Sequence, residues 1–489
     1  MAVDDGTTKC RRPELAGLVA ILLVALALRL AFWFALPNVA HPDEIFQNLE
    51  QAGRLVFGRG YVPWEYQIGA RSWLLPGLIA PFLALASTLS DRPDVFIGAL
   101  HVGLILLSCA VVVAAWSLGR WLSPAAGLWA AALNAIWLEN LYFAPHLLPD
   151  TLSATLLILG IAASPRPGVE RALSYLLAGL ILGLAFVVRI QLGFAVATAL
   201  LTIGGLVVRR YWFLTIGFAI PLLALGLADW ITWGAPFYSV YVYILTNTSG
   251  VADLFGDAPF TFYLTLTTQH WLLATPLLVL TIWLGARRLP SLAAVAAAVV
   301  LTFSCVPHKE YRFVYPALPL LLTLAGIGTA ELLAWVRQRW MPAAAAALWL
   351  AMSVQLGLSY DLRQLFQHDA DLLRAYAVVN ADPTACGVGI VSPPVWHNLN
   401  LTALRADLQF YTTDRENLSH QASAFNYIFA FRRTEQDNSL GFQDVFCGHN
   451  NNVCVTKRPG TCRSDAATPR PSVQTDIAEV LARIGLHAK

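Results

Sequence analysis

Four consecutive residues after the first apolar segment, His41-Pro-Asp-Glu44, combine an imidazole with two carboxylates. Pro42 suits the first turn of a helix, where its missing N–H leaves no hydrogen bond unmade. Asp43 and Glu44 would lie in the same turn, where the positive end of the helix dipole favours a carboxylate. These side chains can supply a general base, or they can simply cap a helix beside the membrane. The four residues alone leave both interpretations open.

A second polar cluster, His308-Lys-Glu-Tyr-Arg312, lies between two apolar segments. An ionised side chain costs about 2.5–3.5 kcal/mol at the centre of a bilayer, so this cluster requires an explanation. If the cluster is helical, His308, Lys309 and Arg312 face one point, because side chains three and four residues apart are neighbours on a helix. Three converging donors suit a phosphate. We favour this interpretation over snorkelling of the cations to the membrane surface.

Together the two clusters suit glycosyl transfer from a lipid-linked sugar phosphate. The phosphate leaves without being protonated, so transfer needs one carboxylate as base for the acceptor hydroxyl and cations to stabilise the phosphate. Glycoside hydrolysis differs, because it needs two carboxyl groups. We take Asp43 and Glu44 as the catalytic candidates, with Asp43 favoured as the base, and assign phosphate binding to His308, Lys309 and Arg312. The sequence has no nucleotide-binding glycine-rich loop, and we expect neither a metal nor a cofactor.

The composition indicates a polytopic α-helical membrane protein. The 489 residues are 57% hydrophobic and only 13% charged, whereas soluble domains carry about 25% charged residues. A net charge of +2 argues against nucleic acid as a partner, and the long apolar runs make the lipid bilayer the surrounding medium. We expect about eleven spans. They lie near 15–36, 73–89, 95–117, 173–188, 192–208, 211–232, 291–306, 313–336 and 342–359, with one ending at Arg288 and one, plus a re-entrant piece, in 124–163.

Basic residues predict the orientation of these spans. Arg11 and Arg12 precede the first span, and Arg209, Arg210 and Arg288 follow later ones. Cytoplasmic loops carry an excess of Lys and Arg, so these residues are expected in the cytoplasm. Both polar clusters and the tail then fall on the non-cytoplasmic side.

Residues 360–489 form a polar tail with strand-like runs at 387–391 and 427–431, which predicts a small α/β domain. The chain therefore divides into a transmembrane catalytic domain, 1–359, and an extracytoplasmic domain, 360–489. In an oxidising compartment four cysteines allow two disulfides of undetermined pairing. The four in the tail are Cys386, Cys447, Cys454 and Cys462.

Longer motifs around both clusters resemble glycosyltransferase family 22, the α-mannosyltransferases that use dolichyl or polyprenyl phosphate mannose. The first outer loop carries His41-Pro-Asp-Glu44 with Gln47 and Glu50, then Phe57-Gly-x-Gly60, Trp64-Glu65 and Arg71-Ser72. The second cluster continues to Phe313, as His308-Lys-Glu-Tyr-Arg-Phe313. Within the family, the first loop is most similar to the third mannosyltransferase of glycosylphosphatidylinositol-anchor synthesis.

This resemblance implies the C-type membrane glycosyltransferase fold, GT-C, and an inverting enzyme. The enzyme would move a mannosyl group from a polyprenyl phosphate to a mannose-containing glycan or glycolipid, forming an α-mannoside, commonly α-1,2. Carried onto this sequence, the motifs imply substrate-binding roles for His41, Trp64 and Arg71. Trp64 could stack on a sugar, although aromatic residues at membrane interfaces are at least as common. The frequent use of Arg, Ala and Leu suggests a bacterial genome, so we expect the protein in a bacterial plasma membrane. If the source is eukaryotic, we expect it in the endoplasmic reticulum membrane.

Three other functions remain open. A transporter or flippase would carry charged residues near the middle of its spans and show related halves, whereas the charges here gather at one face. Another GT-C transferase could use a different polyprenyl-linked sugar, such as arabinose or glucose. An inactive relative could act as a scaffold.

We predict that Asp43, Arg312 and the tail beyond Tyr360 all lie on the non-cytoplasmic side, because of the charge pattern of the loops. Single cysteines introduced at these positions should react with a membrane-impermeant maleimide in intact cells. Labelling of position 43 only after permeabilisation would contradict this topology.

Overall fold

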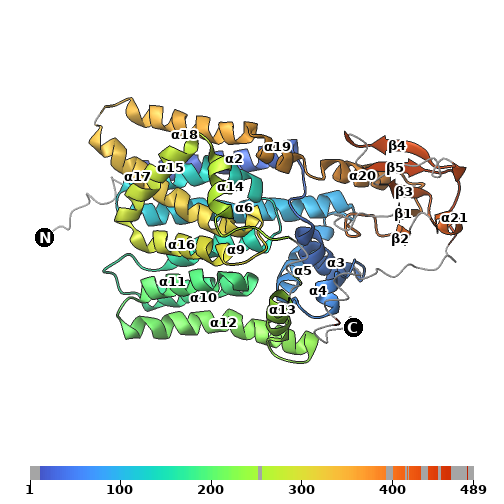
Figure 1. The fold of residues 1–489 in the computed structure, drawn as a ribbon, viewed down its shortest axis with the longest axis horizontal. Coiled ribbons are helices and arrows are strands. Elements are labelled where there is room, and N and C mark those ends of the chain that lie inside the picture. Colours follow the sequence, from blue (N-terminus) through green and yellow to red (C-terminus); the bar gives the residue numbers. More distant parts are fainter. Residues whose placement is uncertain are drawn as a thin grey trace. The chain divides into compact units, whose positions relative to one another are not determined.

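The computed structural model describes residues 11–249, 251, 256–336, 338–391, 400–413, 416, 418–430, 439–449, 453–463 and 482. Most of these residues are helical (Figure 1). The first half contains α2 (Arg11–Ala35), the π-helix η1 (Glu44–Leu49), α3 (Glu50–Phe57), α4 (Trp64–Gln67), α5 (Leu74–Ser87), α6 (Pro93–Arg120), α7 (Pro124–Ile136), α8 (Leu138–Phe143), α9 (Pro149–Ala163), α10 (Ala172–Val188), the 3₁₀-helix η2 (Ile190–Leu192), α11 (Gly193–Gly204) and α12 (Val208–Trp233).

The second half adds further helices and a small sheet. The helices are α13 (Tyr238–Thr248), α14 (Phe262–Trp271), α15 (Ala274–Arg288), α16 (Pro290–Ser304), the 3₁₀-helix η4 (Tyr311–Ala317), α17 (Leu318–Trp335), α18 (Met341–Leu358), α19 (Tyr360–Gln367), α20 (Ala370–Ala381) and α21 (Leu418–Gln421). The strands are β1 (Gly387–Val391), β2 (Gln409–Thr413), β3 (Tyr427–Ala430), β4 (Gln443–Cys447) and β5 (Cys454–Lys457).

The chain forms two compact units. Unit 1 comprises residues 1–35, 102–240 and 252–364. Unit 2 comprises 36–101, 241–251 and 365–489, so it gathers the segment from the end of α2 into α6, most of α13 and the tail. The sequence-based boundary between 359 and 360 stays a prediction.

Unit 1 is a bundle of packed helices. α10 lies against α9 and α12, and α17 lies against α7 and α15 (Figure 1). Its core consists of aliphatic residues from several helices, such as Leu157, Leu182 and Leu320. α15 and α17 approach closely at two glycines: a Cβ added at Gly285 would overlap the carbonyl of Leu324, and one added at Gly328 would overlap that of Thr281. Small residues of this kind let membrane helices pack backbone to backbone.

Five described helical segments are long and apolar enough to cross a membrane: Pro13–Ala35, Pro93–Arg120, Val208–Trp233, Tyr311–Trp335 and Met341–Leu358. A sixth is possible if α14 and α15, which meet at 114°, form one broken span. Fewer described helices therefore reach spanning length than the eleven or so spans that hydropathy predicts. The remaining expected spans correspond to shorter apolar helices of 10–17 residues, because polar and turn-forming residues interrupt the runs.

The segment 124–163 illustrates such an interruption. It forms α7, the short α8 and α9. The expected division into one span and a re-entrant piece stays a prediction. Arg29, fully buried in α2, donates to the carbonyls of Asn134 and Ala135 at the end of α7. These carbonyls have no partner within their own helix, so a guanidinium there satisfies the helix end.

The tail in unit 2 contains the expected α/β domain. Its five described strands form one sheet in the order β2-β1-β3-β5-β4. β1 pairs in parallel with β2 and β3, whereas β5 pairs antiparallel with β3 and β4. α20 contributes Leu372, Tyr376 and Val379 to the core, which also holds Val388 of β1 and Phe429 of β3.

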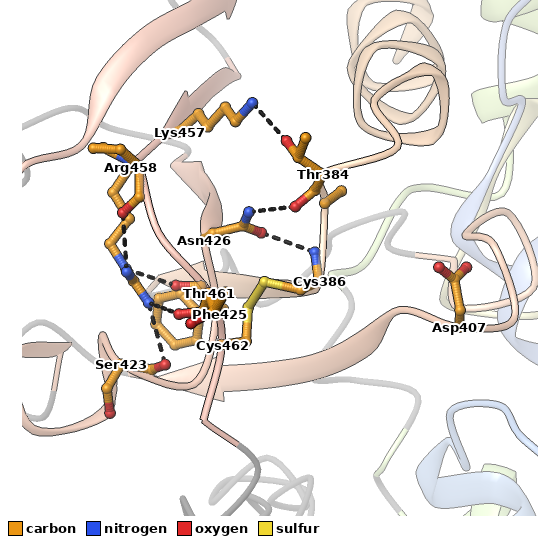
Figure 2. Close-up of a disulfide and its surroundings, with 12 residues drawn as sticks. Thr384, Cys386, Asp407, Ser423, Phe425, Asn426, Lys457, Arg458, Thr461 and Cys462 are labelled. Carbon is orange, nitrogen blue, oxygen red and sulfur yellow. Dashed lines mark hydrogen bonds between the residues drawn. A yellow bond between two sulfur atoms is a disulfide. The ribbon is translucent and has the colours of Figure 1, made fainter.

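Two disulfides cross-link this domain, as the cysteine count allows. Cys386 pairs with Cys462, and Cys447 pairs with Cys454. Figure 2 shows the first pair beside Asn426, whose amide accepts from the Cys386 N–H and donates to the Thr384 carbonyl. Linking residues 76 positions apart restricts the unfolded chain, so this bond stabilises the fold by a few kcal/mol.

The close approach of α15 and α17 gives a stability prediction. Gly328→Ala should lower the free energy of unfolding by about 1–3 kcal/mol, because the new methyl group meets a carbonyl that cannot move away freely. Gly77→Ala, in α5, is the matched control: open space surrounds its Cβ position, and alanine favours a helix over glycine by up to about 1 kcal/mol. Thermal unfolding in detergent should separate the two, and equal midpoints would contradict this packing.

Candidate active site

The acidic motif that follows α2 lies at the start of a helix, as the sequence predicts. Helical structure begins at Pro42 and continues through η1 into α3. Within η1, the Glu50 N–H donates to the carbonyl of Ile45, five residues earlier, which is the hydrogen-bond pattern of a π-helix. Such single-turn π-helices are rare and are frequently found at functional sites.

Buried amide side chains support this unusual turn. The Asn48 amide donates to the Asp43 carbonyl at 3.4 Å, and the Gln51 amide donates to the Phe46 carbonyl at 2.7 Å. The same Gln51 amide reaches the carbonyl of Tyr61 at 2.9 Å. The wide turn is thereby fixed to the loop that follows it.

Asp43 keeps 24% of its side chain exposed, whereas the Glu44 side chain is buried. The Nδ1 atom of His41 lies 3.5 Å from Asp43 Oδ1 and accepts from the Asp43 backbone N–H at 3.2 Å. A ring nitrogen that accepts a hydrogen bond carries no proton, so Nε2 is the ring nitrogen left to donate.

Glu65 forms the second carboxylate of this neighbourhood. Its Oε1 accepts from the Gln47 amide at 2.9 Å. Burial raises the pKa of the Glu65 carboxyl, the charge of Arg71 opposes this shift, and the charge of Asp43 adds to it. The Arg71 guanidinium lies over the ring of Tyr243, 5.2 Å from its centroid. His41, Asp43, Glu65 and Arg71 are thus brought into one region of unit 2, which we call the acidic site.

Trp64 opens the short helix α4 and is half-buried. Its role in sugar binding stays a prediction. Two aromatic residues close to it in sequence are structural: Tyr66 and Trp73 meet edge to face at 5.0 Å, and the Tyr66 hydroxyl donates to the Gln47 carbonyl.

The second cluster is not helical where the sequence predicts it. α16 ends at Ser304, residues 305–310 form bends and extended chain, and only Tyr311 begins the 3₁₀-helix η4. Pro307 accounts for this, since a proline disfavours helical geometry in the residue before it and donates no N–H. The i,i+4 relation between His308 and Arg312 therefore does not apply.

Arg312 and His308 nevertheless belong to one network of ion pairs in unit 1. The buried carboxylate of Asp150 meets Arg189 at 2.6 Å and Arg312 at 3.5 Å. Glu310 contacts Arg312 Nε at 2.6 Å and His308 Nε2 at 2.9 Å. We call this network of ion pairs the cationic site. Its residues come from the start of α9, the break between α10 and α11, and the start of η4.

The sequence predicts that Lys309 faces the same point as His308 and Arg312, but its side chain points elsewhere. Its ammonium group donates to the carbonyls of Ala258 and Val306, the first at 2.9 Å. It thus holds the end of α16 against the loop at 258. Its proposed role in phosphate binding stays a prediction.

An apolar pocket in unit 1 includes Tyr311, the neighbour of Arg312 in sequence. Its one acidic lining residue is Glu139, whose carboxylate accepts from the indole N–H groups of Trp137 at 2.5 Å and Trp271 at 3.2 Å. The other lining residues are Phe143, Thr267, Trp271, Val300, Val314, Tyr315, Ala317, Leu318 and Leu321.

The sequence predicts site roles for His41, Asp43 and Arg71 but not for Glu65, although Glu65 lies among the same motifs. It also predicts no role for Glu310, which lies between its partners His308 and Arg312. Spacing does not reveal the role of Glu65, because its partner Gln47 comes from another helix. Among the described residues, no group of three His, Cys, Asp or Glu side chains is arranged to hold a metal ion.

The contact between His308 and Glu310 predicts a measurable shift. The Glu310 carboxylate raises the pKa of the His308 imidazole above its usual 6.5, although burial and the nearby Arg312 oppose this. A raised pKa means that the folded protein binds this proton more tightly, so the gain in stability is complete below the unfolded pKa and is lost as pH rises through the folded value. Glu310→Gln should therefore lower the His308 pKa.

Histidine NMR in detergent measures this pKa, with His308→Asn to assign the resonance. Glu170→Gln is the control, since it removes an equal charge that is paired with Arg210 instead. An equal pKa in the Glu310→Gln and wild-type proteins would contradict a contact between His308 and Glu310.

The fold of the whole chain is similar to that of a known membrane enzyme. ArnT from Cupriavidus metallidurans, solved with undecaprenyl phosphate, has a TM-score of 0.57 at 13% identity, covering 95% of this chain and 100% of that one. This likeness shows the fold alone, which is the GT-C fold predicted from the motifs.

Two curated relatives match at the level of sequence. GPI mannosyltransferase 3 of Yarrowia lipolytica is 26% identical over 385 residues, which cover 76% of this chain and 72% of that protein. GPI alpha-1,2-mannosyltransferase 3 of Mus musculus is 27% identical over 344 residues, covering 66% and 61%. The match thus spans less than two thirds of the mouse relative.

The model of one protein family matches residues 20–382, which include the acidic site, the cationic site and the segments that join them along the chain. The resemblance inferred from the paired motifs is confirmed by this match. The chain belongs to the Alg9-like mannosyltransferase family.

Proposed function

We propose that this protein is an inverting mannosyltransferase. It takes mannose from a polyprenyl phosphate of the dolichyl type and transfers it to a mannose-containing glycan or glycolipid, forming an α-mannoside with a 1,2 linkage. Family membership supports mannosyl transfer, and the names of the relatives support the acceptor and linkage. The observation that carries the proposal is the partly exposed Asp43 carboxylate, held on a braced helix beside the buried Glu44.

Asp43 acts as the general base. The acceptor hydroxyl attacks C1 of mannose and gives its proton to Asp43, while the bond from C1 to the phosphate oxygen breaks on the opposite face. Attack from the opposite face inverts the configuration, so a β-linked donor produces an α-linked product. Burial and the negative charge of Asp43 both raise the pKa of Glu65, so ionisation of Glu65 beside an ionised Asp43 is disfavoured.

Arg312 and His308 stabilise the departing phosphate. Arg312 offers a planar fork of donors that matches phosphate oxygens, and His308 adds a positive charge when protonated. Asp150 and Glu310 hold these cations in place before substrate binds. Because leaving phosphate carries the developing charge, preorganised cations lower the barrier without a proton transfer.

The apolar pocket at Tyr311 supports a lipid-linked donor. Its lining is almost entirely aromatic and aliphatic, which suits isoprene units rather than a nucleotide. The two disulfides support a non-cytoplasmic position for the tail, because such bonds persist in oxidising compartments. The reaction is accordingly assigned to the outer face of a bacterial plasma membrane, or to the lumenal face of the endoplasmic reticulum membrane in a eukaryote.

A transfer assay with purified protein tests this function. Asp43→Asn should lower turnover by about 10²–10⁴-fold, the usual contribution of a general base, because the amide keeps the shape but cannot take the proton. Glu44→Gln, its neighbour, should lose less. Synthetic polyprenyl phosphates bearing mannose, glucose or arabinose serve as donors, and NMR of the product reports the anomeric configuration.

The outcomes separate the alternatives. Transfer from the glucose or arabinose donor instead of the mannose donor would replace the proposed sugar. An active Asp43→Asn beside an inactive Glu44→Gln would exchange the two roles. Absence of transfer from every donor would leave the transporter and scaffold functions in place of an enzyme.

A further inference from the structure

Glu50 lies seven residues after Asp43 on the same helical segment, and its carboxylate is fully buried. Oε2 accepts from the backbone N–H of Tyr61 at 2.7 Å, and Oε1 accepts from the backbone N–H of Thr402 at 2.7 Å. Both partners belong to unit 2, but Thr402 comes from the tail domain. Burial raises the pKa of this carboxyl group, and the two N–H donors oppose the shift. Glu50 therefore connects the helical segment 42–57, which carries Asp43 and which we call the acidic helix, to the segment 400–408, which leads into β2.

A second residue makes the same connection. The guanidinium of Arg59 donates to the carbonyls of Leu404 at 2.5 Å, Ala406 at 3.2 Å and Leu408 at 3.4 Å. These bonds require Arg59 to approach the tail, and Gly60 permits this turn with a φ of +157°, where a Cβ would press on Arg54. Three carbonyls of one short segment are thus held by a single side chain.

The contact is also tight in steric terms. Gly53 in α3 faces Thr402, and a Cβ added at Gly53 would overlap the Thr402 hydroxyl oxygen and lie 3.1 Å from its Cγ2. α3 can therefore lie against the segment 400–408 only because residue 53 has no side chain.

The other end of the acidic helix is fixed by the tail as well. The Val39 N–H donates to the His368 carbonyl at 3.2 Å, and His368 Nδ1 lies 2.8 Å from the Val39 carbonyl. His368 precedes α20, and Val39 precedes His41 by two residues. The helix that carries Asp43 is thus held on both sides.

The segment 400–408 is itself firmly attached to its domain. Arg405 donates to the carbonyls of Asn380, Asp382 and Ala385, which follow or end α20. The Asn380 amide donates to the Ala403 carbonyl at 2.7 Å. The acidic helix is therefore bonded to a segment that is itself fixed to α20 and to the residues that follow it.

We propose that the segment 400–408 and the His368 contact position the acidic helix, with Glu50 and Arg59 as positioning residues that do not touch substrate. The tail domain is then a working part of the transferase. This inference rests on the proposed function, since Asp43 must be the base for its position to matter. An error of about 1 Å in the placement of a reacting group can cost about 10²-fold in rate, so the effect should fall on kcat.

A double-variant cycle tests the contact. Gly53→Ala should lower kcat by about 10- to 100-fold with the KM of the donor nearly unchanged, because the methyl group displaces the helix from Thr402. Thr402→Ala alone should stay near wild type, since the backbone N–H to Glu50 remains. The combined Gly53→Ala, Thr402→Ala variant should recover most of the activity, because Thr402→Ala removes the hydroxyl and Cγ2 methyl groups that the new Cβ at position 53 would meet. Gly77→Ala is the matched control.

Hydrogen exchange gives a readout that does not need activity. Amides of residues 42–57 should exchange faster in Gly53→Ala than in the wild type, and the double variant should restore their protection. If Gly53→Ala does not fold, Glu50→Gln takes its place: its amide nitrogen cannot accept an N–H, so one of the two bonds is lost, with faster exchange and lower kcat expected.

Two results would overturn the inference: wild-type kcat and exchange in Gly53→Ala, or a double variant that is no better than Gly53→Ala. If the wild-type protein transfers no sugar from any donor, the proposed function fails. Hydrogen exchange in the wild type, Gly53→Ala and the double variant then decides by itself whether the tail holds the acidic helix.

Discussion

Removing a carboxylate from water costs several kcal/mol unless charges or hydrogen-bond donors replace the lost hydration. This constraint acts on a chain with so few charged residues, and the buried acids show how it is met. Asp150 faces two guanidinium groups, Glu50 takes two backbone N–H groups, and Glu139 takes two indole N–H groups. Each acid joins segments that are distant along the chain, so its need for partners also organises the fold.

The two sites meet the constraint in different ways. In the cationic site, acids and bases alternate from Arg189 to His308, so an incoming phosphate would compete with carboxylates that already hold the cations. In the acidic site, backbone groups and side-chain amides do most of the holding, which leaves Asp43 partly exposed. Alternating charges can exchange partners when a substrate arrives, whereas a carboxylate on a helix that is braced through its backbone keeps its position. This difference suits the proposed roles, an anion site at the cations and a base at Asp43.

Much of this arrangement can be predicted from the sequence. Hydropathy indicates a helical membrane protein, strand-like runs indicate the tail domain, and Pro42 indicates the start of the acidic helix. Local errors arise where one residue outweighs a periodic pattern: Pro307 prevents a helix through the cationic motif, and polar residues divide apolar runs into short helices. The pairing of Glu50 with Thr402 cannot be predicted from spacing, because 352 residues separate the two. The π-helix escapes prediction for a related reason, since it depends on where two buried amides find carbonyls.

That separation also determines when the acidic helix can become complete during biosynthesis. Chains are synthesised from the N-terminus at about 5–20 residues per second, so Glu50 is made on the order of tens of seconds before its partner at Thr402. Throughout this interval the carboxylate lacks one of its two donors, and Arg59 lacks the three carbonyls that it will bind. The helix that carries Asp43 thus gains these bonds only after the tail domain has emerged and folded. On the proposed function, a nascent chain without this domain would hold its base less firmly, so the same bonds would link the onset of activity to folding of the tail.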